Sequence, residues 1–117
     1  MKTTREILAC TKITRKALRI YMEKQLILPA GKNEQGGWLF EDSTVKTVED
    51  ILYFQSIGFT LNEIRSVRTM EKEALCTAIE NKIIELKEKK TVLNQTISMA
   101  EQELHRMRGE EHGGSKT

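Results

Sequence analysis

The chain has 117 residues, 38% of them hydrophobic and 31% charged, with a formal net charge of +2. Because domains usually span about 100 to 150 residues, this length predicts one compact domain with an appendage and no separate ligand-binding domain. Two distant cysteines without metal-ligand spacing argue against a disulfide framework, and the lack of an apolar leader or a long apolar run predicts a cytoplasmic protein without membrane contact.

Positive charge is concentrated near the N-terminus. Residues 1–40 contain eight basic and three acidic side chains, a balance of +5. Since the whole chain carries +2, the remaining residues carry −3. A basic N-terminal part indicates a polyanionic partner, although a solvated basic surface is the simpler alternative.

Two short helices are predicted first, separated by a tight turn. One spans residues 4–10, with Thr4 as its N-cap, and the next spans residues 15–24, with Thr14 as its N-cap. The second helix has one apolar face and one basic face. The apolar face contains Ala17, Leu18 and Tyr21, and the basic face contains Arg15, Lys16 and Arg19.

A β-hairpin, or wing, is predicted after the chain's single proline, Pro29. Gly36 and Gly37 can supply the positive φ of a tight turn, and the following residues 38–40 suit a short strand. Basic Lys32 lies on the first arm of this hairpin.

Two further helices are predicted after the wing. The first runs from residue 42 or 43 to 56, carries Leu52 among its apolar positions, and is stopped by Gly58. The second opens at Thr60, because Thr60 and Glu63 have the spacing of a capping box.

A long final helix is predicted from residue 70 to 107, a stretch without glycine or proline. Its apolar residues alternate in spacings of three and four, the 3.5-residue period of a coiled coil. At ~55 Å, estimated at about 1.5 Å per residue, this helix cannot bury its apolar seam alone, so we expect it to pair with its own copy. The predicted dimer interface contains Ile79, Ile83, Leu86, Lys90, Leu93, Ile97, Ala100 and Leu104.

The run from Ile13 to Pro29 resembles the mercury-resistance regulator (MerR) family. The family pattern is S-x-R-T-L-R-Y-Y-E-x-x-G-L-I-x-P, and the residues that fall in its places are Thr14, Lys16, Ala17, Leu18, Arg19, Tyr21, Leu26, Ile27 and Pro29. The later family motif G-F-S-x-x-E-I corresponds to residues 58–64, GFTLNEI.

This resemblance implies a mostly α fold, namely a winged helix-turn-helix domain (1–70), an antiparallel coiled-coil dimerisation helix (71–108) and a flexible tail (109–117). By this resemblance we expect the short form of the family, without an effector-binding domain. The resemblance also implies a homodimer that binds a pseudo-palindromic promoter in double-stranded DNA and distorts it, and so controls how RNA polymerase meets the promoter. The DNA-contacting residues that it implies are Thr14, Arg15, Lys16, Arg19, Tyr21, Lys32 and Trp38.

Several positions depart from the family pattern. Trp38 stands where the wing motif G-Y-R-x-Y has an arginine that clamps a phosphate, and Gln25 replaces the glycine after the second helix. Ile20 and Met22 replace a tyrosine and a glutamate. Trp38 is either a hydrophobic prop under the wing or a contact to a sugar, and Tyr21 is either a core residue or a contact.

The cysteine at the start of the long helix also has two interpretations. In an antiparallel pair centred near Lys90, Cys76 approaches His105 of the partner subunit. A metal or thiol-switch site is one interpretation, and a cysteine buried in the seam is the other, because two ligands are too few for a tetrahedral site. Lys90, the polar residue of the seam, is predicted to set the register of the pair.

We therefore expect a transcriptional regulator that needs no cofactor. The alternative is an adaptor or chaperone modulator that uses the same domain to bind protein, and the missing wing arginine favours it. An enzyme is not expected, since the sequence has no glycine-rich phosphate loop, no nucleophile paired with a base and no metal-ligand cluster.

Overall fold

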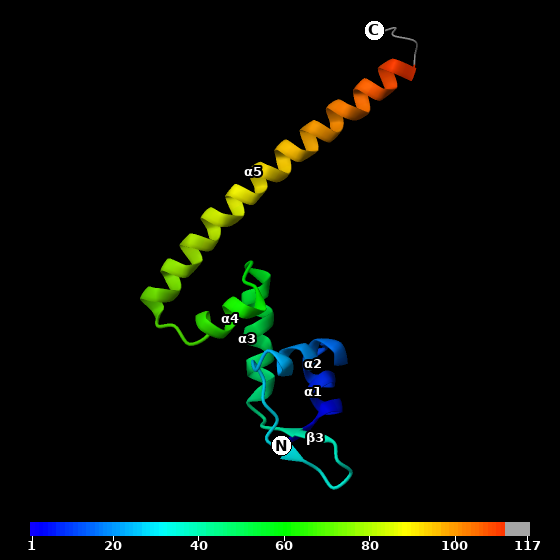
Figure 1. Cartoon of the computed structure of the whole chain (residues 1–117). Coiled ribbons are helices and arrows are strands. Elements are labelled where there is room, and N and C mark those ends of the chain that lie inside the picture. Colours follow the sequence, from blue (N-terminus) through cyan, green and yellow to red (C-terminus); the bar gives the residue numbers. More distant parts are fainter. Residues whose placement is uncertain (112–117) are drawn as a thin grey trace. The chain divides into compact units, whose positions relative to one another are not determined.

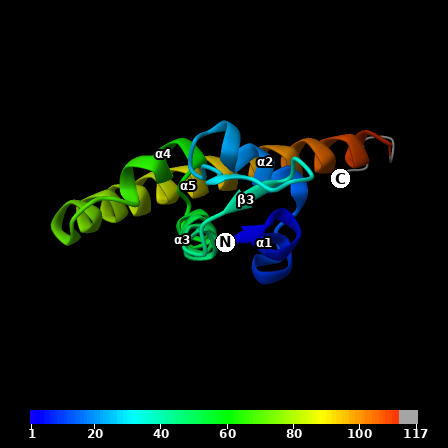
Figure 2. The ribbon, with the colours of Figure 1, turned by 90° about the horizontal axis from the view of Figure 1, so that it is seen from below.

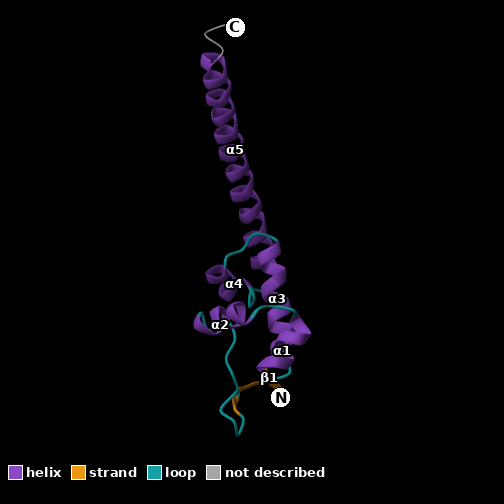
Figure 3. Cartoon of the chain, turned by 90° about the vertical axis from the view of Figure 1, so that its right-hand side faces the viewer, coloured by secondary structure: helices purple, strands orange, loops and turns teal. Residues whose placement is uncertain are grey.

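The computed structural model describes residues 1–111 (Figure 1). The chain separates into two compact units, Met1–Cys76 and a second unit that begins at Thr77, which we call the head and the arm. In chain order the elements are β1 (Lys2–Thr3), α1 (Thr4–Thr11), α2 (Arg15–Glu23), β2 (Gly31–Lys32), β3 (Trp38–Phe40), α3 (Thr44–Ser56), α4 (Leu61–Val67) and α5 (Lys72–Glu111). The predicted fold class, mostly helical with a small β wing and a long C-terminal helix, is confirmed (Figure 3).

Helix α1 is capped by Thr3 and not by the predicted Thr4. The Thr3 hydroxyl accepts a hydrogen bond from the Glu6 amide at 3.2 Å, and the Glu6 carboxylate accepts one from the Thr3 amide at 2.8 Å. This capping box needs a threonine three residues before a glutamate, and that spacing selects Thr3. The same bond to the Thr3 amide lowers the pKa of Glu6.

The sheet has three strands in the order β1-β3-β2, all antiparallel, so the wing has one more strand than predicted. Lys2 pairs with Phe40 and Thr3 with Leu39 on one side of β3, while Gly31 pairs with Leu39 on the other. Strand β1 was missed because two residues are too few to show an alternating pattern.

The wing turn uses only one of its two glycines for a left-handed backbone. Gly36 has φ 83°, whereas Gly37 lies against the side chain of Asn33, where an added Cβ would meet Nδ2 at 3.2 Å. The Asn33 Oδ1 accepts hydrogen bonds from the amides of Gln35 and Gly37, at 3.0 and 2.8 Å. These bonds order the hairpin loop in place of a second positive φ.

The core of the head joins α1, β3, α3 and α4. Five of its largest side chains are completely buried, and they come from all four elements: Ile7, Phe40, Val48, Ile51 and Ile64. Figure 2 shows α3 nearly end-on with α1 and β3 beside it, in agreement with the contacts of α1 with both. Leu52, one of the apolar positions from which α3 was predicted, is 39% exposed, because it follows buried Ile51 and lies ~100° further round the helix.

Helix α5 supplies the described part of the arm. It continues to Glu111, beyond the predicted end at residue 107, so the predicted flexible tail (109–117) is wrong at residues 109–111. The rest of that predicted tail, from 112 to 117, lies outside the described residues. Within residues 1–111, no helix combines the length and the apolar character needed to cross a membrane.

Candidate nucleic-acid interface

The basic surface of the head is built on α2. The Thr14 hydroxyl accepts a hydrogen bond from the Ala17 amide at 3.0 Å, so the predicted N-cap of this helix is confirmed. Leu18 and Tyr21 are buried, while the predicted basic face is exposed and contains Arg15, Lys16 and Arg19.

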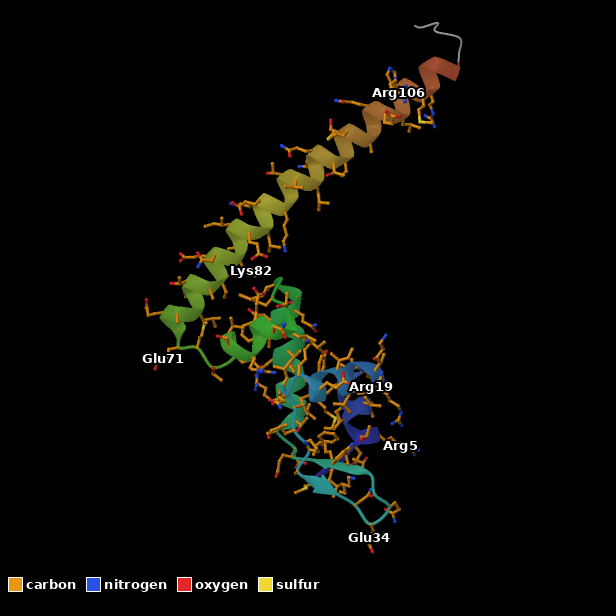
Figure 4. The ribbon with its side chains drawn as sticks, viewed as in Figure 1. Arg5, Arg19, Glu34, Glu71, Lys82 and Arg106 are labelled. Atoms are coloured by element: carbon orange, nitrogen blue, oxygen red, sulfur yellow. The ribbon has the colours of Figure 1, made fainter. Side chains whose placement is uncertain are left out.

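Arg19 extends away from α2 into solvent (Figure 4). Its Nε lies 4.0 Å from a carboxylate oxygen of Glu23, and both side chains are about two-thirds exposed, at 67% and 66%. An exposed pair at that distance contributes little free energy, so the Arg19 guanidinium is available to another anion.

The C-terminal end of α2 is held by hydrogen bonds that the sequence pattern did not predict. The amides of Gln25 and Leu26 donate to the carbonyls of Met22 and Tyr21 at 3.0 and 2.9 Å, which is the Schellman arrangement. That arrangement puts Gln25 in the left-handed region, at φ 60°.

Helix α4 also contacts this end of α2. The Arg65 guanidinium donates a hydrogen bond to the carbonyl oxygen of Lys24, and the Lys24 ammonium donates to Asn62 Oδ1 at 3.2 Å. These partners are separated by 41 and 38 residues, so no local pattern could have revealed them. Together they join the C-terminal end of α2 to α4.

Tyr21 is a core residue, which corrects its inclusion among the DNA-contacting positions. Only 4% of it is exposed, and its hydroxyl lies 3.5 Å from Gln55 Oε1 on α3. Burial raises the pKa of the Tyr21 phenol above its usual value, because the phenolate would lose hydration. The helical spacing from Leu18 was the correct signal, since it places both side chains on the apolar face.

The wing presents a paired lysine and tryptophan. Lys32 on β2 is the cross-strand partner of Trp38 on β3, and its Nζ lies 4.6 Å from the centre of the indole ring. Trp38 is 42% exposed, so it is not simply a prop covered by the wing. Glu34 lies at the tip of the wing loop (Figure 4).

One surface hollow, of about 520 Å³, brings the wing and α2 together. Its lining combines three apolar residues, three charged residues and one threonine: Leu18, Met22, Trp38, Arg15, Arg19, Glu23 and Thr4. The structure thus places Arg15, Arg19 and Trp38, predicted separately, around one space.

This arrangement of two short helices, a basic second helix and a three-stranded wing matches a known family. Residues 3–71 match the family described as MerR HTH family regulatory protein. The chain belongs to the MerR HTH family. The predicted family membership is therefore confirmed, over more than half of the chain.

Known MerR proteins resemble this chain over different lengths. The HTH-type transcriptional regulator CueR of Vibrio cholerae is 31% identical over 71 residues, which cover 58% of this chain and 49% of CueR. This chain therefore spans about half the length of the curated relative that it matches.

Two solved MerR structures share the fold. The N-terminal part of MtaN, the Bacillus subtilis multidrug transporter activator, is 21% identical with a TM-score of 0.74, covering 89% of this chain and 98% of that one. HiNmlR, a MerR family regulator lacking the sensor domain and bound to promoter DNA, is 19% identical with a TM-score of 0.58, covering 95% and 94%.

The MerR pattern explains why Gln25 has an unusual backbone. Its position corresponds to the glycine of the family motif, and glycine adopts a φ of 60° without steric cost. Trp38 likewise occupies the position of the MerR wing arginine, with Lys32 on the adjacent strand.

The predicted seam of α5 is uncovered in the single chain. Ile83, Leu86, Leu93, Ile97 and Leu104 are all between 41% and 61% exposed. Lys90 is exposed among them. Off the seam, ion pairs join neighbouring turns of α5. Hydrogen bonds from Lys89 and Lys82 lower the pKa of Glu85, and a hydrogen bond from Arg106 lowers the pKa of Glu103.

Both cysteines, Cys10 and Cys76, are exposed in the single chain. Within residues 1–111 of one chain, no group of three or more His, Cys, Asp or Glu side chains could hold a metal ion. A site between Cys76 and His105 of the partner subunit therefore stays a prediction with two ligands.

Proposed function

We propose that this chain regulates transcription by binding a pseudo-palindromic promoter as a homodimer and distorting it. The observation that carries this proposal is the exposed basic face of α2 beside the wing. Arg15 and Arg19 line the same hollow as Trp38, and Trp38 pairs with Lys32 across the sheet. Two arginines of α2 and the wing pair of Lys32 and Trp38 are thereby brought beside one hollow.

This basic face has the chemistry needed to contact both bases and phosphates. A helix fits the major groove of B-DNA, where an arginine can donate two hydrogen bonds to O6 and N7 of guanine. We assign that role to Arg15 and Arg19, and phosphate contacts to Lys16 and to Lys32 on the wing. Thr14 caps the N-terminus of α2. We assign the backbone amides of that first turn and the Thr14 hydroxyl to further contacts with phosphate.

The exposed seam of α5 supports a homodimer. Five large apolar side chains at coiled-coil spacing are 41–61% exposed, and burying them against a second copy removes them from water. An antiparallel pair of α5 helices carries two heads related by a two-fold axis. Such symmetry explains why a pseudo-palindrome is the expected binding site.

Distortion of the promoter follows from the family resemblance and has a known energetic basis. Bending or untwisting a site of 20–30 base pairs costs about 1–6 kcal/mol, which additional protein contacts must offset. We propose that the wing contacts flanking phosphates and so offsets part of this cost. RNA polymerase then meets a promoter with altered spacing.

The test is fluorescence anisotropy of labelled promoter fragments from the gene's own neighbourhood, at two salt concentrations. Full-length protein and the Arg19→Ala variant are compared. Arg106→Ala is the matched control, because Arg106 is also an exposed arginine paired with a glutamate of its own helix. We expect tight, salt-sensitive binding that Arg19→Ala weakens by about 1–3 kcal/mol and Arg106→Ala leaves unchanged.

The second candidate function is an adaptor that binds protein through the head. The observation that favours it is the exposed indole of Trp38 in place of a cation. Weak duplex binding that ignores sequence and tolerates Arg19→Ala would support the adaptor over the regulator.

A further inference from the structure

The wing of this chain carries its positive charge on the opposite strand from the family pattern. Trp38 on β3 occupies the arginine position, and Lys32 on β2 is its cross-strand partner. The Lys32 ammonium lies 4.6 Å from the centre of the indole ring. At that distance the ring face attracts the cation, so the lysine side chain is held against the ring and does not sample solvent freely.

The Lys32 ammonium and the Trp38 indole can make different kinds of contact. A lysine ammonium has three N–H donors, and attraction to a ring face leaves donors free for a phosphate oxygen. The indole presents an apolar surface, and Trp38 as a whole is 42% exposed. The pair therefore offers a cation and an apolar surface side by side.

The hollow beside Trp38 has matching chemistry. Leu18 and Met22 of α2 supply its apolar residues, and Arg15 lies at its edge. Glu23 also lines the hollow and disfavours an anion next to it, although Arg19 lies 4.0 Å from its carboxylate. Within the hollow, phosphate is thus favoured near Arg15 and disfavoured near Glu23. Lys32 adds a second cation outside the lining, on the ring of Trp38.

We propose that Lys32, Trp38 and the hollow form a subsite for one sugar–phosphate unit of duplex DNA. The deoxyribose lies against the indole and the apolar residues of α2, and the phosphate accepts hydrogen bonds from Lys32. Trp38 acts as a positioning residue for the Lys32 ammonium as well as a contact. This inference rests on the proposed function, and it assigns to two residues the phosphate contact that one arginine makes in the family.

The experiment separates this subsite from DNA binding as a whole. Trp38 is the chain's single tryptophan, so fluorescence excited at a wavelength that the two tyrosines do not absorb reports on the wing alone. The probe is a labelled duplex of the promoter upstream of the gene, which also gives the dissociation constant by anisotropy. We expect the tryptophan emission to change as the duplex saturates the protein.

Three variants test the roles of the pair. We expect Lys32→Gln to weaken binding and to lower the slope of log affinity against log salt by about one per wing. Trp38→Leu should weaken binding about two- to fivefold per wing, while Trp38→Phe keeps a ring and most of the affinity. Lys46→Gln, a change at an exposed lysine of α3 that pairs with Asp50, is the matched control and should change neither quantity.

The outcomes distinguish the two proposals. If the anisotropy shows tight binding, but tryptophan emission is unchanged and Trp38→Leu binds like the wild type, the subsite is wrong and the proposed function stands. If Lys32→Gln leaves the salt slope unaltered, the assigned phosphate contact is likewise wrong. If no duplex binds the wild-type protein, both proposals fail together.

Discussion

The guanidinium of Arg65, on α4, donates a hydrogen bond to the carbonyl oxygen of Lys24, the residue that ends α2. A carbonyl at a helix C-terminus carries partial negative charge, so an arginine is a favourable partner there. We expect Arg65→Met to lower the free energy of unfolding by about 1 kcal/mol, since the bond is exposed. Urea denaturation of the full chain measures this change.

The same substitution should also weaken promoter binding, because α2 is then less firmly oriented. Arg5→Met is the control for stability, since Arg5 is another exposed arginine of the head, on α1. Equal midpoints in urea for Arg65→Met and Arg5→Met would contradict the stabilising role of the Lys24 contact.

Gln25 is strained where the family has glycine. A φ of 60° destabilises the folded state by about 1–2 kcal/mol for a residue with a Cβ. Glycine avoids this steric cost but loses more backbone entropy on folding, so only part of that free energy is regained. We expect Gln25→Gly to raise the free energy of unfolding by about 0.5–1 kcal/mol. Gln25→Ala removes the side chain but keeps the Cβ, so it should give no gain. A glycine variant no more stable than the alanine variant in thermal melts would argue against backbone strain.

Tyr21 links stability to alkaline pH. Its pKa is raised in the folded chain, so the unfolded chain releases the phenolic proton first as pH rises. The folded state then binds more protons, and the free energy of unfolding falls as pH rises above about 10. Tyr21→Phe removes this contribution, so its stability should decline less steeply there than that of the wild type.

Tyr53 is the matched control for this titration, because it is the chain's other tyrosine and is 60% exposed. Denaturation by urea at a series of pH values should give Tyr53→Phe the wild-type slope. If the two phenylalanine variants have the same pH dependence, burial of Tyr21 is not the cause.

Leu93 and Val92 are adjacent on α5 and almost equally exposed, at 61% and 58%, but only Leu93 lies on the predicted seam. We expect Leu93→Glu to destabilise the proposed homodimer, because it replaces two apolar side chains of the seam with carboxylates that lose hydration in the interface. Val92→Glu should remain dimeric. Sedimentation velocity at micromolar concentration measures both. Dissociation by Val92→Glu, or a stable dimer of Leu93→Glu, would mean that the seam is on another face.

The caps and helices of the head were predictable because their causes are local. Thr14 and Thr60 each bond an amide three residues later, and that spacing is visible in the sequence. Helical periodicity likewise placed Leu18 and Tyr21 on the buried face. At Thr3 the local signal was present but was assigned one residue late.

The features that were missed depend on partners far apart in the chain. Strand β1 exists because Thr3 meets Leu39, and the bond from Arg65 to Lys24 spans 41 residues. The cation–π pair of Lys32 and Trp38 depends on the hairpin register that places these two residues opposite each other. The sequence of the hairpin loop does not predict that register. Such contacts become visible only when the tertiary structure brings their elements together.

The pairing of β1 with β3 also has a consequence for synthesis. Residues 2 and 3 are made before their partners at 39 and 40, which follow about 2–8 s later at ~5–20 residues per second. Throughout that interval Ile7 of α1, which ends up completely buried beside β3, has no core to enter. The core of the nascent head can therefore close around Ile7 only after Phe40 and α3 have been made.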